Sequence, residues 1–197
     1  QNKQMETVVV TGTPRTELGK KATRALRKEG NVPCSLYGGS ETVTFFAPVT
    51  AFKRLIYTPE FRLAEVQLNG KSYKAIVKDT QFDPVKDELL HVDLQELVDN
   101  VPVKVSVPLN LKGTAKGAAV GGKVEQVQRR LNILALPKDL VSGIELDITE
   151  LDLGGILRIS DLKTENIKYL LSGSNPVARM AVPRAAKEAA AAEGKKK

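Results

Sequence analysis

The amino-acid sequence predicts a mainly β protein with a few short helices, in which an N-terminal six-stranded β-barrel with two helices precedes a second β-rich domain. Three observations support this fold class. Most apolar stretches are short and rich in β-branched residues, as strands are. Only two segments, both in the first half, repeat apolar residues at helical spacing. The hydrophobic fraction of 42% over 197 residues is enough for two small cores.

The first half of the chain alternates strands with the two helices. The β-branched run at 7–11 predicts a strand, and residues 18–29 predict a helix that ends at Gly30-Asn31. A second helix is expected from Pro48, with an apolar face spaced as in a helix. Asn69-Gly70 predicts a hairpin turn, because both residues tolerate positive φ. The remaining strands are expected at 32–37, 43–47, 62–68, 72–78 and 89–95.

A second β pattern begins after residue 97. Valines at every second position of 101–107 predict a half-buried strand, and its prolines favour the edge of a sheet. Further strands are expected at 124–128, 131–136, 144–148, 156–159 and 177–182. We therefore expect domains at 1–97 and 98–184, followed by a flexible Ala/Lys-rich tail at 185–197.

The glycine-rich segment 113–122 (GTAKGAAVGG) invites comparison with a phosphate-binding loop. It lacks the Gly-Lys-Ser/Thr ending of a P-loop, and it contains no GxGxxG between a strand and a helix. A flexible loop is the favoured interpretation.

Composition narrows the classes of function. The formal net charge of +7 and the pI of about 9.4 suit a polyanionic partner, although many soluble proteins are as basic. The single cysteine, Cys34, excludes an intramolecular disulfide and a thiolate zinc site, and its apolar surroundings predict a buried structural residue. No apolar run approaches the roughly 18 residues of a membrane span, and we expect no signal peptide. These features fit a reducing cytoplasm.

The first helix carries the clearest functional signal. At about 100° per residue, one face collects cations and a hydroxyl, with Lys21 and Lys28 at its flanks. This face comprises Lys20, Thr23, Arg24 and Arg27, and the opposite apolar face comprises Leu18, Ala22, Ala25 and Leu26. A solvated surface helix is the alternative, but such a helix usually interleaves acidic residues, and this face has none. The pattern therefore favours contact with nucleic acid.

Such a helix suits RNA, whose wide minor groove exposes ribose hydroxyls beside phosphates. Arg24 and Arg27 would pair with phosphates through their planar guanidinium groups, and Thr23 would reach a ribose hydroxyl. Lys20 would act as a point charge on the backbone.

The only histidine, His91, is two residues before Asp93, so both should point to the same face of a strand. Such a pair could perform acid–base chemistry, but no partner nucleophile is indicated, and a metal site normally needs more ligands. We therefore expect no enzyme, no catalytic residue and no metal site. The favoured interpretation is a histidine oriented by a carboxylate and contacting bases or sugar edges.

The stretch 15–27 (RTELGKKATRALR), followed by 30–33 (GNVP) and 36–39 (LYGG), resembles a known family, the bacterial large-subunit ribosomal protein twenty-five in its long form, also called the general stress protein Ctc family. A second matching signature is 91–93 (HVD), which follows 79–81 (DTQ). The resemblance continues beyond residue 100 through 101–103, 121–122, 147–151 and Gly154, and so covers nearly the whole chain.

This resemblance implies a barrel that binds 5S ribosomal RNA at a loop-E-type helix and is related to the anticodon-binding domain of glutaminyl-tRNA synthetase. The RNA-binding positions it implies are Arg15, Lys20, Thr23, Arg24, Arg27, Tyr37, Gln81, His91 and Asp93. Ala25 departs from the family where some members have arginine, and we expect it to face the barrel. Cys34 stands where alanine is common.

The resulting prediction is a structural component of the large ribosomal subunit, cytoplasmic and located on the ribosome. Neighbouring ribosomal proteins are possible partners of the C-terminal domain, and we expect no cofactor, small-molecule substrate or membrane contact. The alternative is a free stress-response protein that acts mainly through protein partners. A transfer-RNA-binding appendage of a synthetase is disfavoured, because the chain has no nucleotide-binding domain.

Overall fold

The computed structural model describes residues 5–17, 19–119, 121–162 and 166–182. Within these ranges the chain forms two compact units, which are described separately below. The first contains the described residues up to 105 together with 135–142, and the second contains 106–134 and the described residues from 143 onward. The predicted tail at 185–197 and the predicted helix residue Leu18 lie outside the described residues. The domain boundary at 97/98 stays a prediction.

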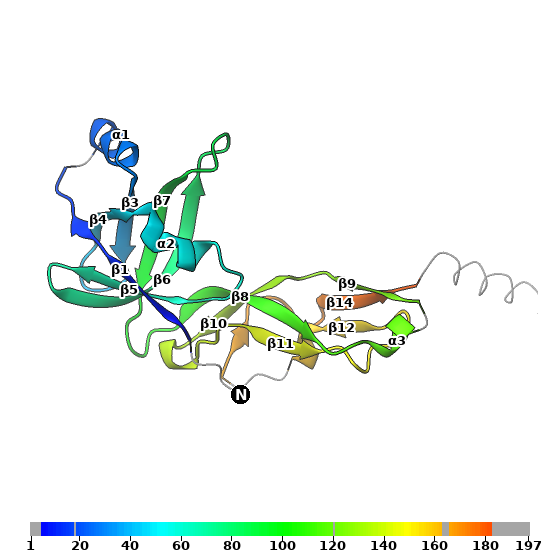
Figure 1. The fold of residues 1–197 in the computed structure, drawn as a ribbon. Coiled ribbons are helices and arrows are strands. Elements are labelled where there is room, and N and C mark those ends of the chain that lie inside the picture. The colour runs from blue at the N-terminus through cyan, green and yellow to red at the C-terminus, as the bar shows by residue number, and fades with distance from the viewer. Residues whose placement is uncertain (1–4, 18, 120, 163–165, 183–197) are drawn as a thin grey trace, which may run out of the picture. The chain divides into compact units, whose positions relative to one another are not determined.

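The predicted fold class is confirmed, because the described part of the chain is mainly β with three short α-helices (Figure 1). The first unit contains a seven-stranded sheet in the order β1-β5-β6-β7-β3-β4-β2. Its strands are β1 (Thr7–Thr11), β2 (Thr13–Pro14), β3 (Asn31–Tyr37), β4 (Val43–Pro48), β5 (Leu63–Leu68), β6 (Lys71–Phe82) and β7 (Leu89–Glu96). Two helices accompany this sheet, α1 (Lys20–Lys28) and α2 (Val49–Ile56).

The strand beyond the predicted six arises at Gly12, which separates β1 from β2. β1 pairs in parallel with β5 at one edge of the sheet, whereas β2 pairs with β4 at the other edge. The chain therefore runs from one edge to the other within three residues and curls the sheet into a barrel-like form. A Cβ atom on Gly12 would lie 2.4 Å from Cδ2 of Phe45, so this close approach needs glycine.

The core of the first unit is formed by the inward residues of alternating strands and by α2. In β1, Val8 and Val10 are buried while Thr7, Val9 and Thr11 are exposed, as a strand with one buried face requires. The fully buried side chains include Val10, Val32, Leu36, Phe45, Phe52, Val66 and Leu94. Cys34 is also fully buried, which confirms its predicted structural place.

The two helices differ in how they attach. α2 buries Phe52 and Leu55 in the core, with Val49 and Ile56 packed beside them. α1 has no buried residue and packs on the first unit mainly at β3. Figure 1 shows α1 at one end of the sheet. The side chains of Lys20, Lys21, Arg24, Ala25, Arg27 and Lys28 are exposed there. This attachment leaves most of its surface available to a partner.

The second unit contains the remaining strands and a third helix. A four-stranded sheet has the order β11-β8-β10-β13, and a three-stranded sheet has the order β12-β14-β9. The elements are β8 (Val103–Lys112), α3 (Lys116–Ala119), β9 (Lys123–Gln126), β10 (Arg130–Ala135), β11 (Ile144–Asp147), β12 (Ile156–Arg158), β13 (Lys168–Tyr169) and β14 (Pro176–Ala181), with a 3-10 turn at Ile159–Asp161. The first three residues of β8, the last residue of β10 and the 3-10 turn Pro137–Asp139 belong to the first unit. Part of its core consists of Ala115, Ile148, Leu151 and Met180.

Two expectations for this region are wrong. The strand predicted at 101–107 is not at a sheet edge, because β8 lies between β11 and β10. Its prolines are compatible with this position, since Pro102 precedes the strand and the pairing with β11 begins only at Leu109. The glycine-rich segment is also not a free loop. It forms α3, and the buried Gly117 donates its backbone N–H to the carbonyl of Leu151.

Candidate nucleic-acid interface

Helix α1 is a short helix with five basic residues and no acidic one. It follows Gly19, whose φ of 114° only glycine adopts readily, and it ends before Gly30, whose φ is 79°. Neither an acidic side chain in its first turn nor a side-chain hydrogen bond at its N-cap stabilises it. Its charge and position therefore make it the first candidate for contact with a polyanion.

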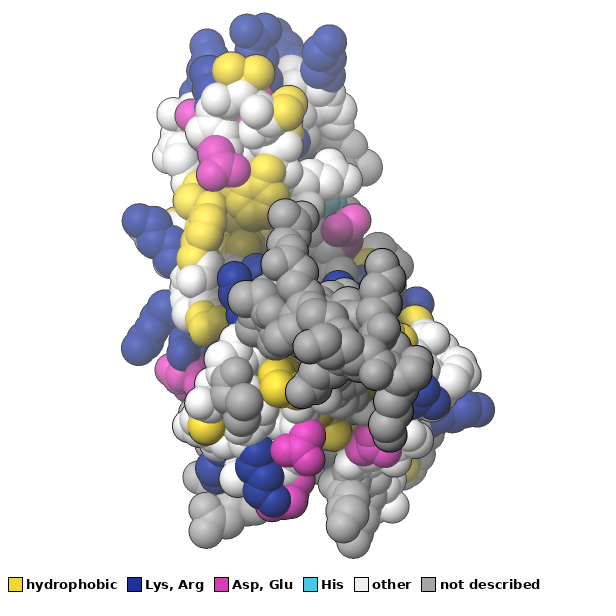
Figure 2. Space-filling model, turned by 90° about the vertical axis from the view of Figure 1, so that its right-hand side faces the viewer, with side chains coloured by type: hydrophobic (Ala, Val, Ile, Leu, Met, Phe, Trp, Pro, Cys, Tyr) yellow, Lys and Arg dark blue, Asp and Glu magenta, His cyan; other side chains and the backbone are white. Residues whose placement is uncertain are grey.

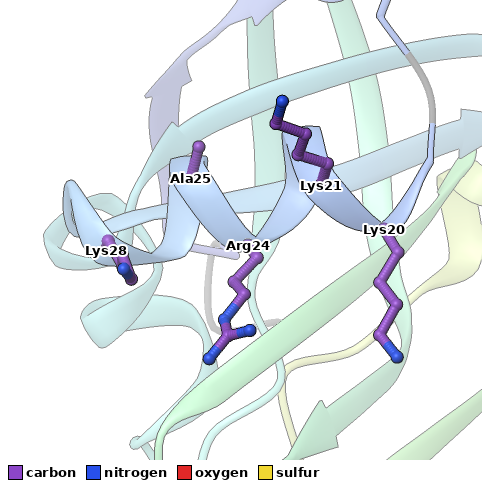
Figure 3. Close-up of a pocket in the computed structure, with 5 residues that line it drawn as sticks. All are labelled: Lys20, Lys21, Arg24, Ala25 and Lys28. Atoms are coloured by element: carbon purple, nitrogen blue, oxygen red, sulfur yellow. The ribbon is translucent and has the colours of Figure 1, made fainter.

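The exposed face of α1 is an open, shallow hollow lined by Lys20, Lys21, Arg24, Ala25 and Lys28 (Figure 3). Lys20, Arg24 and Lys28 follow one another at intervals of four residues, which forms a ridge along the helix. In Figure 3, Lys20 and Arg24 extend along one side of the helix, and Lys21 and Ala25 extend along the other. Figure 2 shows Lys and Arg side chains gathered at the end of the first unit where Figure 1 places α1.

None of these cations forms a salt bridge with another residue of the described ranges. In the second unit, by contrast, Arg179, Lys116 and Lys112 each have a carboxylate partner at 2.7, 2.6 and 3.5 Å respectively. The positive charge of α1 is thus not neutralised by any described side chain, which leaves it available to an anionic ligand.

The helix is turned about its axis from the predicted orientation. Ala25 is exposed, so the expectation that it faces the barrel is wrong. Ala22, Thr23 and Leu26 form the half-buried side instead. The reason is that Leu26 is the only large apolar side chain of α1, and its burial determines which face meets the sheet.

Two residues of the predicted cationic face are engaged within the protein. The Thr23 hydroxyl donates within its own helix, lying 3.0 Å from the carbonyl oxygen of Gly19 and 3.1 Å from that of Lys20. Arg27 donates from Nε to the carbonyl oxygen of Leu90 in β7, at 3.0 Å. The Arg27 bond holds α1 beside the strand that contains His91.

A second group of polar residues lies on the outer face of β3, β6 and β7. The register places Gln81 opposite His91, Asp79 opposite Asp93, Ser35 opposite Asp93, and Tyr37 opposite Gln95. Residues opposite one another on paired strands point to the same face. The intervening Val92 and Leu94 are fully buried on the other face. The predicted residues Tyr37, Gln81, His91 and Asp93 are therefore brought together, and we call these four, with Ser35, Asp79 and Gln95, the strand surface.

His91 and Asp93 point to the same face, as predicted. Nδ1 of His91 lies 3.3 Å from Oδ1 of Asp93, which is ion-pair distance without hydrogen-bond alignment. On the other side of the ring, Nε2 lies 3.5 Å from the hydroxyl of Ser35. Both side chains keep an exposed fraction, 21% for His91 and 28% for Asp93, so a ligand can reach them.

Tyr37 lies within the electrostatic influence of two carboxylates. Its pKa is raised above the ordinary value, first by burial and then by the negative charges of Asp93 and Asp79. The hydroxyl therefore remains protonated near neutral pH and can donate a hydrogen bond. Asp79 and Ser35 were not predicted as site residues, although their spacing of two from Gln81 and Tyr37 would have indicated the shared face.

Arg15 occupies a separate, half-buried position. Its backbone N–H donates to the Thr44 carbonyl at 3.0 Å, and its own carbonyl accepts from the Thr44 hydroxyl at 3.2 Å. Nε and Nη1 are buried and have no partner among the described residues. The guanidinium group lies near enough to Cys34 to oppose, in part, the rise of the thiol pKa that burial causes.

The described residues contain no cluster of three or more histidine, cysteine or carboxylate side chains that could hold a metal ion. No helix among them is both long and apolar enough to cross a membrane. The chemistry of the candidate interface is therefore that of cations, hydroxyls, amides and carboxylates.

Comparison with known proteins gives a consistent result over nearly the whole chain. Residues 10–94 match the model of the ribosomal L25p family, and residues 102–184 match the model of the C-terminal domain of ribosomal protein TL5. Three similar proteins are each named large ribosomal subunit protein bL25. One from Amoebophilus asiaticus is 39% identical over 98% of this chain and 99% of its own length. One from Cytophaga hutchinsonii is 40% identical over 98% and 100%, and one from Porphyromonas gingivalis is 39% identical over 94% and 98%.

Proposed function

The chain belongs to the ribosomal L25p family, and from this we propose that it is a structural component of the bacterial large ribosomal subunit that binds 5S ribosomal RNA. Membership in a family of ribosomal proteins agrees with the prediction that the chain is not an enzyme. The proposed RNA-binding part is the first domain, residues 1–97, and the second domain is proposed to contact neighbouring ribosomal proteins. The proposed location is the cytoplasm, on the large subunit.

The observation that carries the RNA-binding proposal is the position of α1, with its unneutralised cations, beside the strand surface. Arg27 joins the two through the carbonyl of Leu90, the residue before His91. Phosphate contacts position a protein on RNA, whereas contacts to base and ribose edges carry specificity. The cations of α1 suit contacts to phosphates, and the donors and acceptors of the strand surface suit contacts to base and ribose edges.

In the proposed complex, Lys20 and Arg24 bind phosphates. Arg24 can do so through two parallel N–H donors, and Lys20 acts as a point charge. Their exposed positions on α1 need no rearrangement for this contact. This part of the binding is electrostatic and depends on salt concentration.

The strand surface supplies donors and acceptors for groove edges. Gln81 has both in its amide, Tyr37 donates from a hydroxyl that stays protonated, and Asp93 only accepts. A carboxylate repels phosphates, so its place beside His91 suits exocyclic amino groups or ribose hydroxyls rather than the backbone. This favours recognition of an irregular helix whose edges are accessible.

The buried donors of Arg15 support its inclusion among the proposed RNA-binding residues. Buried polar groups without a partner cost free energy, so a guanidinium group that turned outward onto a phosphate would gain the partners it lacks here. Thr23 bonds to the carbonyls at the start of α1, and Arg27 holds α1 beside β7 through its bond to Leu90.

The experiment is competition between 5S ribosomal RNA and an unrelated structured RNA of similar length for the purified full-length protein. The proposal expects the 5S RNA to displace the competitor at much lower concentration. Equal displacement would contradict it, and failure of the protein to sediment with large ribosomal subunits would then favour a free protein with protein partners.

A further inference from the structure

Lys21 and Lys28 share the exposed face of α1 with Lys20 and Arg24. The ridge of Lys20, Arg24 and Lys28 runs the full nine residues of α1, and at a rise of about 1.5 Å per residue its first and last Cα atoms are roughly 12 Å apart. Lys21 extends along the other side of the helix from Lys20 and Arg24 (Figure 3). The helix therefore presents a broad cationic surface rather than a single charged stripe.

Local interactions within α1 oppose this arrangement. Lys20 and Arg24 are like charges four residues apart, as are Arg24 and Lys28, and such pairs destabilise a helix. Cations in the first turn, here Lys20 and Lys21, also interact unfavourably with the helix dipole. The Gly19 N-cap has no side chain to offset this, and no residue of the helix is buried.

A bound polyanion would offset both the like-charge repulsion and the unfavourable interaction with the helix dipole. Phosphates neutralise like charges, and they are favoured near the N-terminus of a helix. The small Ala25 side chain, which also lines the hollow, lets an RNA backbone approach the helix surface closely. On a helix that contacts only solvent, nothing would offset the mutual repulsion of five cations without an acidic residue.

We propose that Lys21 and Lys28 are phosphate-binding residues, which with Lys20 and Arg24 form one four-cation face on RNA. This inference rests on the proposed function and extends it from the two predicted cations of this face to four. The contacts that Lys21 and Lys28 make are to the backbone, so they add affinity without adding sequence preference.

The test is the salt dependence of 5S ribosomal RNA binding for the double variant Lys21→Gln, Lys28→Gln. Each phosphate contact contributes roughly 0.9 to the slope of log affinity against log salt concentration on duplex nucleic acid. The double variant should therefore lose about two slope units, and its affinity deficit should shrink roughly tenfold between about 50 and 200 mM salt. Restoring charge with Lys21→Arg, Lys28→Arg should restore the slope.

The matched control is Lys71→Gln, Lys74→Gln, which removes two exposed lysines from β6 of the same unit. This control should bind with the wild-type slope. An unchanged slope for the Lys21, Lys28 variant, or an equal loss for the control, would overturn the inference. Wild-type protein that does not prefer 5S RNA over an unrelated RNA would instead overturn the proposed function, so the two failures are distinguishable.

Discussion

The guanidinium group of Arg27 donates a hydrogen bond from Nε to the backbone carbonyl of Leu90, 3.0 Å away. These residues are 63 positions apart in the chain, and the bond joins α1 to β7. Because α1 has no buried residue, its orientation depends strongly on hydrogen bonds of this kind. Arg27 thus acts on the interface by holding the helix that carries the other cations.

Replacing Arg27 with Gln should loosen α1. Amide hydrogen exchange over residues 20–28 should become faster, because the tie to Leu90 is lost. The free energy of unfolding should fall by about 0.5–1.5 kcal/mol, the usual net value of one hydrogen bond. The control is Arg24→Gln, which removes an exposed charge of the same helix and should not make exchange faster, because it relieves like-charge repulsion with Lys20 and Lys28. Equal exchange in both variants would show that the tie has no structural effect.

The pair of His91 and Asp93 should contribute to RNA binding as a unit. Because the His91 ring lies within ion-pair distance of the Asp93 carboxylate, a double-mutant cycle with His91→Ala and Asp93→Ala should give a coupling energy of about 0.5–3 kcal/mol. Neither single variant should reduce the salt slope, since neither removes a phosphate contact. Additive losses of affinity, measured by titration with 5S RNA, would contradict a joint role.

Substitution of Ala25 by Arg tests the orientation of α1. The position is exposed and lines the cationic hollow, so a longer side chain meets no steric barrier there. The variant should retain its melting temperature and should gain about 0.9 unit of salt slope on 5S RNA. If Ala25 faced the sheet, the same substitution would lower the melting temperature and leave the slope unchanged.

The strand surface could be predicted from sequence because strand geometry has a period of two. His91 and Asp93 had to share a face once β7 was recognised, and the pattern of Val8 and Val10 indicated the inner face of β1 in the same way. The orientation of α1 was harder. A nine-residue helix with the single large apolar residue Leu26 leaves its rotation to tertiary packing, which the sequence pattern does not contain.

The position of β8 between two other strands was also not predicted, because it too depends on tertiary structure. Proline excludes a strand from a central position only where its missing N–H would have paired. Pro108 lies just before the paired stretch that begins at Leu109, and this register is a property of the fold rather than of the local sequence.

Cys34 should serve as a reporter of unfolding and of alkaline pH. Burial raises the thiol pKa in the folded state, so below the unfolded thiol's pKa of about 8.5 the group is protonated in both states. As pH rises above that value, only the unfolded state ionises, and stability falls by at most about 1.4 kcal/mol per pH unit. Cys34→Ala should lack this decrease when urea melts at about pH 8 and 9.5 are compared. A thiol reagent should modify wild-type protein only on unfolding.

Binding of 5S ribosomal RNA across a salt series, for the wild type beside the double variant Lys20→Gln, Arg24→Gln, tests the central claim most directly. These two residues are the predicted cations that the structure leaves exposed and without a salt-bridge or hydrogen-bond partner within its described ranges, whereas Arg27 is bonded to Leu90. The expected result is wild-type binding that exceeds binding to an unrelated structured RNA, with the variant weaker and its slope lower by about two units. Equal binding of both RNAs, or an unchanged slope in the variant, would contradict the assignment of α1 as the docking helix.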